Sequence, residues 1–238
     1  VVVVVAVLFL TGCTIKFFYN QLDWFVPFYA SIYLDLNSKQ EDFFSEQFDQ
    51  QLLWHRKTQL PAYADFLERV SRDVSKGLTT ETIIYIHHTA RGFMTVLVNQ
   101  LAPDIVDLFY QFDDKQLARL YGKLDEDSEE FNQKYILAPP KDLRERQVEK
   151  TRQYVEFWTG SLNPDQIKVI EQWGERTILM GPEFHEMQTR WLQEFRRVMT
   201  LRANRSEYKK AFLALLENRQ FGRSKTFKEK YITKTLYK

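Results

Sequence analysis

The chain has little of what disulfide-linked folds and strained active sites require. It contains one cysteine, Cys13, so no disulfide can form within it. Its 238 residues include eight glycines and seven prolines, which leaves few positions for the strained loops that active sites often use. The sequence also lacks a Gly-x-Ser-x-Gly elbow, a glycine-rich phosphate loop, a His-Glu-x-x-His helix and a cysteine pair. We therefore expect neither an enzyme nor a bound cofactor.

An excess of charge of one sign is missing as well. Lysine and arginine number 33 against 32 acidic residues, a formal net charge of +1, so no global field marks a nucleic-acid binder. Basic residues gather only in 222–238, where the one acidic residue is Glu229. We expect this segment to be a basic tail. It is either solvated or in contact with anionic groups.

Long apolar runs are absent except at the start, where ten apolar residues end at Leu10. Thr11, Gly12 and Cys13 follow, and Lys16 is the first charged residue. A membrane span needs about 20 apolar residues, whereas a signal peptide needs a shorter run before small residues at a cleavage point. We predict that 1–12 is a lipoprotein signal peptide with Leu10, Thr11 and Gly12 as its cleavage box. Cys13 is then the site of lipid attachment, including palmitate.

What the chain does contain is a repeated helix start. Asn37, Thr79, Asp113 and Asn163 each follow an apolar residue, and all but Thr79 place a glutamine three positions later. Such a residue caps free backbone N–H groups, and the glutamine closes a capping box. The composition favours helix over sheet, and no alternating strand-like run is present. The sequence predicts an all-α fold of helical hairpins packed as one or two bundles.

Proline and glycine divide this helical chain. Ala138-Pro139-Pro140 is the clearest break, and it separates an N-terminal helical part, 13–138, from a C-terminal helical part, 141–221. We also expect helices to stop before Pro61 and at Pro103, because proline lacks the N–H that a helix interior uses.

Aromatic residues crowd the first predicted helix: Trp24, Phe25, Phe28, Tyr29 and Tyr33. Aromatic rings with polar tips favour the membrane interface, but aromatic clusters also fill protein cores. Of these two alternatives we favour the core.

Trp54-His55-Arg56 is the candidate polar binding point. Arg56 offers a forked donor for a lipid headgroup or a peptide carboxylate. The alternative, which we favour, is a structural role with Trp54 in the core and Arg56 paired with an acid such as Asp23 or Asp35.

The other histidines do not predict a metal site. His87 and His88 are adjacent and point about 100° apart on a helix, so one ion cannot bind both. His185 is followed by Glu186, which lies on a neighbouring face rather than at the spacing of helical ligands.

Four segments carry a resemblance to a known family: Tyr19-Asn20-Gln21-Leu22-Asp23-Trp24, Tyr33-Leu34-Asp35-Leu36, Trp54-His55-Arg56 and Leu60-Pro61-x-Tyr63-Ala64. The chain resembles a family of uncharacterised proteobacterial lipoproteins, classed as a domain of unknown function. The resemblance implies a helical, lipid-anchored envelope protein and no particular activity. Thr14 stands where other Gram-negative lipoproteins carry Asp for retention in the inner membrane, so the resemblance implies the outer membrane.

A weaker resemblance concerns Leu162-Asn163-Pro164-Asp165-Gln166. It is similar to the Leu-Thr-x-x-Gln signature of small helical periplasmic chaperones of the Spy type. Our first hypothesis is a non-enzymatic lipoprotein of the outer membrane, facing the periplasm, that binds another envelope protein and no nucleic acid. The alternative is a chaperone-like binder of unfolded periplasmic proteins. A metal-dependent or hydrolytic enzyme that uses His55 or His185 is the third hypothesis.

Overall fold

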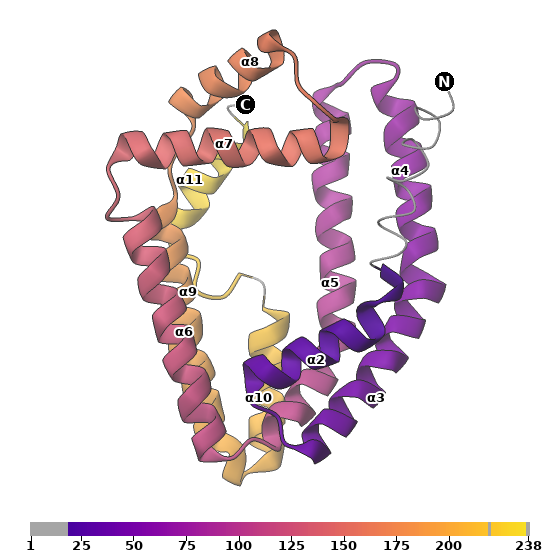
Figure 1. Cartoon of the computed structure of the whole chain (residues 1–238), viewed down its shortest axis with the longest axis vertical. Coiled ribbons are helices and arrows are strands. Elements are labelled where there is room, and N and C mark those ends of the chain that lie inside the picture. Colours follow the sequence, from indigo (N-terminus) through magenta and orange to yellow (C-terminus); the bar gives the residue numbers. More distant parts are fainter. Residues whose placement is uncertain (1–18, 219, 237–238) are drawn as a thin grey trace. The chain divides into compact units, whose positions relative to one another are not determined.

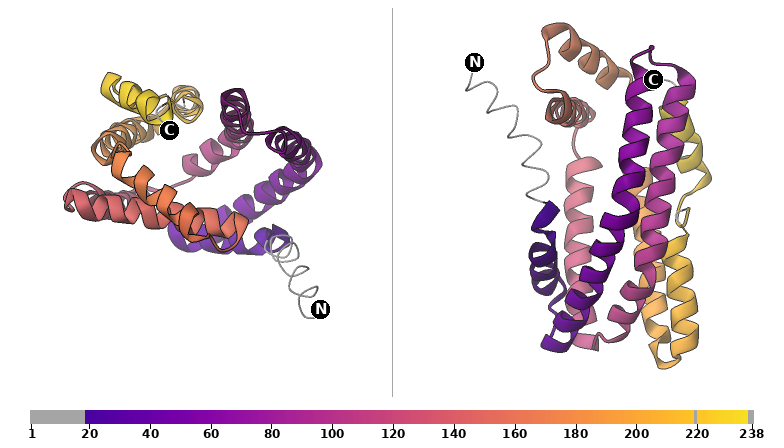
Figure 2. Two further views of the ribbon diagram at one scale, coloured as in Figure 1. Left: turned by 90° about the horizontal axis from the view of Figure 1, so that it is seen from above. Right: turned by 90° about the vertical axis from the view of Figure 1, so that its right-hand side faces the viewer.

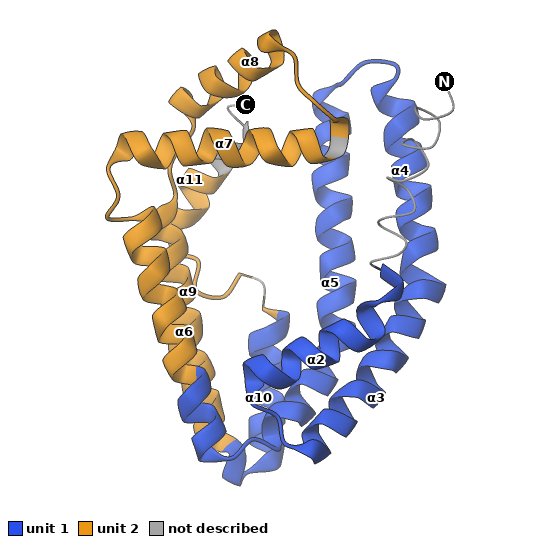
Figure 3. Cartoon of the chain, viewed as in Figure 1, with its two compact units in different colours: residues 1–120, 202–217 blue, residues 121–201, 218–238 orange. Residues whose placement is uncertain are grey.

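The computed structural model describes residues 19–218 and 220–236. These residues are mostly helical and include no strand, which confirms the predicted all-α fold (Figure 1). The described residues form two compact units, one of residues 19–120 and 202–217, the other of 121–201, 218 and 220–236 (Figure 3). The predicted boundary at Ala138 to Pro140 thus lies inside the second unit, which we call unit 2.

Unit 1 is built from α2 (Leu22–Leu34), α3 (Ser38–Trp54), η1 (His55–Gln59), α4 (Leu60–Val74), α5 (Thr80–Tyr110), the first turns of α6 (Asp114–Tyr135), and α10 (Arg205–Glu217). The elements α3, η1 and α4 continue into one another as a single helical rod (Figure 1). The chain then turns back at Gly77, and α5 packs antiparallel against this rod (Figure 2).

The predicted caps are present. The Asn37 side chain accepts a hydrogen bond from the Gln40 N–H at 3.2 Å, and the Gln40 side chain accepts one from the Asn37 N–H at 3.0 Å. The equivalent bonds between Asp113 and Gln116 measure 2.7 and 3.1 Å. These capping boxes satisfy N–H groups that a helix start leaves without partners.

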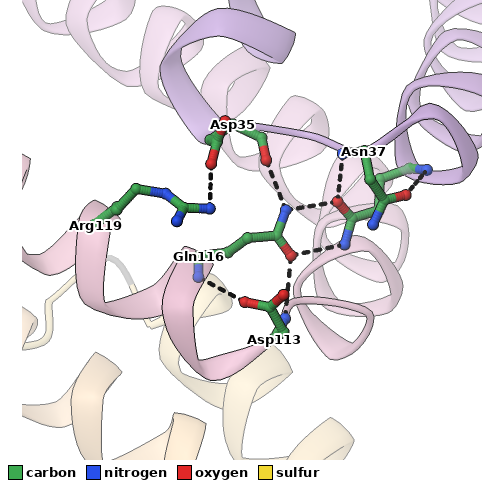
Figure 4. A network of polar contacts seen from close by, with 6 residues as sticks. Asp35, Asn37, Asp113, Gln116 and Arg119 are labelled. Atoms are coloured by element: carbon green, nitrogen blue, oxygen red, sulfur yellow. Dashed lines mark hydrogen bonds and ion pairs between the residues drawn. The ribbon is translucent and has the colours of Figure 1, made fainter.

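The two boxes are also joined to each other (Figure 4). The side-chain amides of Gln40 and Gln116 form a cyclic pair, each donating to the other's oxygen at 3.1 and 2.7 Å. The second N–H of Gln40 donates to the Gln111 carbonyl at 2.9 Å, and that of Gln116 to the Asp35 carbonyl at 2.7 Å. Both accepting carbonyls lie two residues before a cap residue, so the arrangement is close to two-fold symmetric.

Two predicted helix ends were wrong. The helix does not stop before Pro61, because η1 inserts a wider π turn in which the Leu60 N–H bonds to the His55 carbonyl. A wider turn relieves the clash that a proline ring makes with an α-helix carbonyl. Nor does α5 stop at Pro103, since it runs on to Tyr110 with Pro103 inside it.

Burial explains why α5 continues through its proline. Ala102 and Val106, on either side of Pro103 in the sequence, are fully buried in a unit where α5 packs against α10. From α10, the buried Tyr208 hydroxyl donates to the Val106 carbonyl at 2.9 Å. The packing of this stretch outweighs the one backbone bond that proline removes.

Unit 2 contains the rest of α6, α7 (Pro140–Thr159), α8 (Pro164–Arg176), α9 (Gly181–Thr200) and α11 (Lys225–Leu236). Arg144 of α7 holds the end of α8, because its guanidinium donates to the Gly174, Glu175 and Thr177 carbonyls at 3.2, 3.0 and 3.0 Å. These are carbonyls that the end of a helix leaves without partners, and a cation there also complements the helix dipole.

The segment expected to be a basic tail contains α11. Phe227 is buried at 1% exposure, and the Lys230 ammonium contacts the Glu183 carboxylate of α9. Gly222 allows the preceding turn, since its φ is +76° and a Cβ there would lie 2.7 Å from the Met187 carbonyl oxygen. Residues 225–236 are therefore a packed helix of unit 2.

The paired glutamines provide a stability test. We expect Gln116→Ala to lower the free energy of unfolding by about 1–3 kcal/mol, because it leaves buried partners of the Gln116 amide unsatisfied. Gln166→Ala is the matched control. Gln166 closes a box with Asn163 in the same way, but it is exposed. Urea unfolding should show a clearly smaller loss for Gln166→Ala, and equal losses would contradict the role given to the buried pair.

Candidate functional site

The candidate polar residues lie where α3 passes into the π turn. Trp54 ends α3, and His55 and Arg56 begin η1. The turn is stabilised locally, because the Thr58 hydroxyl donates to the Trp54 carbonyl at 2.8 Å. Single π turns within helices occur frequently at functional sites, since they re-aim side chains that a regular helix would align.

His55 is the centre of an aromatic and polar cluster. Its Nδ1 lies 2.7 Å from the Tyr19 hydroxyl oxygen. The Tyr63 ring meets the imidazole edge-on at 5.5 Å between centroids, and Tyr63 in turn packs against Phe93 of α5 at 4.6 Å. The cluster therefore ties the residues just before α2 to the rod and to α5.

Burial sets the protonation of this cluster. It lowers the pKa of His55, which favours the neutral imidazole. It raises the pKa of Tyr19, and the charge of nearby Arg56 opposes that rise. A neutral His55 that carries its proton on Nε2 accepts a hydrogen bond from the Tyr19 hydroxyl at Nδ1, so the half-buried pair carries no charge.

Arg56 does not form the ion pair expected from the sequence. Its guanidinium carbon lies 5.5 Å from the centroid of the Tyr19 ring. Asp35, one of the expected partners, pairs with Arg119 instead. Among the described residues no carboxylate pairs with Arg56, and Trp54 is half-buried rather than part of the core. The structural role that we favoured, with Trp54 in the core and Arg56 paired with an acid, is therefore wrong on both counts.

The aromatic residues of α2 are not in the core either. Trp24, Phe25, Phe28 and Tyr29, together with the aliphatic Ile32, are between 49% and 61% exposed. Their spacing places them on one face of the helix. Half-buried residues such as Val26, Ala30 and Leu34 alternate with them along α2, which packs against α3. The expectation that this cluster fills the core was wrong, because four of its rings are exposed and Tyr33 is only half-buried.

The remaining candidates are separate from this cluster. Leu10, Thr11, Gly12 and Cys13 lie outside the described residues. The His185 ring stacks on Phe131 in unit 2, at 6.3 Å between centroids, while His87 and His88 lie on α5 of unit 1. Over residues 19–218 and 220–236, no three His, Cys, Asp or Glu side chains gather in a group that could hold a metal ion.

Sequence reasoning missed Tyr19 and Tyr63 as partners of His55. Both lie in the segments that carry the family resemblance, which was the available signal. Residue spacing could not predict that these tyrosines contact His55. Tyr19 and His55 are 36 residues apart, and the π turn changes the helical periodicity between His55 and Tyr63.

A family model described as a family of unknown function, DUF6279, matches residues 32–228. The chain belongs to this family. No curated protein matches the chain, and no solved structure does. The DUF6279 match begins within α2 and covers the π turn, so His55, Arg56 and Tyr63 lie inside the family domain, while Tyr19 precedes it. None of the helices that the structure describes has the length and apolar character needed to cross a membrane.

The lowered pKa of His55 predicts a pH dependence of stability. The unfolded chain takes up a proton near the ordinary histidine pKa of about 6.5, whereas the folded chain takes it up only at lower pH. The stabilisation is therefore complete above about pH 6.5 and is lost as the pH falls from there toward the folded-state pKa. Urea unfolding at pH 7.5 and 5.5 should show a larger loss of stability for the wild type than for His55→Gln, and identical losses would contradict a neutral, half-buried His55.

Proposed function

We propose that this DUF6279 protein is a non-enzymatic envelope lipoprotein, anchored in the outer membrane by acyl chains on Cys13 and facing the periplasm. The observation that carries the proposal is the exposed aromatic face of α2, which follows the predicted anchor after the short segment 14–21. Tryptophan and tyrosine favour the interface between headgroups and acyl chains. An apolar helix face beside a lipid anchor is an arrangement typical of a surface that lies in this interface.

Arg56 also supports an orientation in which the aromatic face of α2 lies against the membrane. Its guanidinium has no carboxylate partner among the described residues, and it stacks on Tyr19, which is separated from Cys13 only by 14–18. A guanidinium binds phosphate through a forked pair of N–H groups. We propose that Arg56 lies near phospholipid headgroups while the α2 face contacts the acyl boundary, and that the rest of the body binds another envelope protein.

The anchor is tested by replacing Cys13. In cells fed a palmitate analogue, the wild-type chain should be labelled and Cys13→Ala should not be, because the acylated sulfur is gone. Cys13→Ala should also be released from membranes by washing far more readily than the wild type. Labelling of Cys13→Ala at the wild-type level would contradict the lipoprotein assignment.

The orientation is tested separately with an environment-sensitive fluorophore. Acylation consumes Cys13, the only cysteine, so a cysteine introduced elsewhere in the lipidated protein is labelled uniquely. Tyr29→Cys on α2 should give a blue-shifted emission in phospholipid vesicles that brominated lipids quench. Leu67→Cys on α4 is the matched control, because Leu67 and Tyr29 are both 61% exposed.

The Leu67→Cys emission should stay close to its value in water. Equal emission from the two positions would show that α2 has no special contact with the membrane. That result would leave the anchor at Cys13 intact, since palmitate labelling measures the anchor independently.

A further inference from the structure

Unit 2 contains a pocket of about 290 Å³ formed by α6, α7, α9 and the loop before α9. Most of its wall is apolar: Phe131, Leu143, Leu179, Met180 and Phe184. A volume near the lower end of the range for ligand pockets suits a single alkyl chain or ring better than a large cofactor.

The charged side chains that line this pocket are basic, and its neutral polar residues are Gln147 and Tyr135. Arg146 and Lys150 lie one turn apart on α7, so both extend from the same face of that helix. The Lys150 ammonium donates to the Tyr135 hydroxyl, and the Arg146 guanidinium donates to the Lys134 carbonyl at 2.6 Å. Tyr135 also lines the pocket, and no acidic residue does.

Neither cation has a carboxylate partner among the described residues. Along α7, Glu145 pairs with Lys141 and Glu149 with Arg152. Asp142, four residues before Arg146, forms no ion pair with it. The resulting positive potential acts on Tyr135, whose pKa is lowered first by the hydrogen bond from Lys150 and further by the charges of Lys150, Lys134 and Arg146. An apolar cavity with unneutralised cations is complementary to an anion that carries an apolar tail.

We propose that this pocket binds an anionic amphiphile, with its carboxylate or phosphate head at Arg146, Lys150 and Tyr135 and its alkyl tail between Phe131, Leu143 and Phe184. A fatty acid and a lysophospholipid share this chemistry. The tail is needed for affinity, because Arg146 and Lys150 are exposed and contacts between exposed charges are weak and screened by salt. Burial of the tail against apolar side chains supplies the larger contribution.

The proposal does not depend on the lipid anchor, so it is tested on the full chain with Cys13→Ala, which leaves every described residue unchanged. The probe is 11-(dansylamino)undecanoate, a fluorescent fatty acid, below its critical micelle concentration. We expect saturable binding that dodecanoate displaces at least tenfold more effectively than dodecanol. Inorganic phosphate alone should not displace the probe.

Variants then locate the site. Introducing Arg146→Gln and Lys150→Gln together into the Cys13→Ala chain should weaken probe binding at least tenfold. The urea midpoint should change little, because both side chains are exposed. Lys141→Gln is the matched control, since Lys141 lies on α7 outside this pocket, and it should bind as the parent chain does.

The source of the ligand is resolved by comparing dodecanoate with lysophosphatidylglycerol as competitors, and effective displacement by either or both supports the site. Equal displacement by dodecanoate and dodecanol would overturn the proposal. So would unchanged binding in the double variant, or displacement by phosphate alone.

Discussion

The cyclic pair of Gln40 and Gln116 is the interaction on which the arrangement of unit 1 depends. A glutamine amide has two N–H donors and an oxygen that accepts two bonds, and in both residues all of these positions are used. Leaving a buried amide without a hydrogen-bond partner costs more free energy than forming that hydrogen bond contributes. The network is therefore stabilising only when all of its hydrogen bonds are formed. Two helix starts that are 76 residues apart are thereby fixed against each other.

This pair determines where the neighbouring elements lie. Asp35 ends α2 in a left-handed conformation, with φ at 53°, and its carbonyl accepts from Gln116 while its carboxylate pairs with Arg119. A left-handed non-glycine residue is disfavoured by about 1–2 kcal/mol, and the bonds around Asp35 offset that cost. The direction in which α2 leaves α3, and hence the direction of its aromatic face, is set at this residue.

The local part of this structure could be predicted from the sequence, but the long-range part could not. Asn37, Asp113 and Asn163 were identified as caps because a capping box is encoded within four residues. The same local pattern occurs at Gln116, which is buried and paired, and at Gln166, which is exposed. Nothing within either box distinguishes them, because the difference lies in what the rest of the chain packs around each glutamine.

The predictions of the helix ends and of the buried aromatic cluster were wrong for the same reason, because tertiary packing decided both. Pro103 is a stop signal by local rules, and burial of Ala102 and Val106 overrides it. On α2 the apolar residues occupy both faces, so periodicity could not say which face meets α3. The partners of Arg56 were also assigned from charge alone, whereas the structure gives Asp35 to Arg119 and leaves Arg56 on an aromatic ring.

The proposed anchor gives the exposed face of α2 a role that differs from attachment. An extended chain reaches about 3.3–3.6 Å per residue, so an acylated Cys13 would keep Tyr19 within about 22 Å of the bilayer surface. Several acyl chains, at about 0.8 kcal/mol for each buried CH₂, already hold such a protein firmly, and further apolar contact adds little to retention. It does decide orientation, because an anchor on a short tether leaves the body free to rotate. Trp24 and Tyr29 lie on one side of α2, and the opposite side packs against α3. If the aromatic side contacts lipid, the side that packs against α3 would therefore face the periplasm. In the proposed orientation, Arg56 over the Tyr19 ring would lie at headgroup depth, and a cation there would favour this orientation over its inverse.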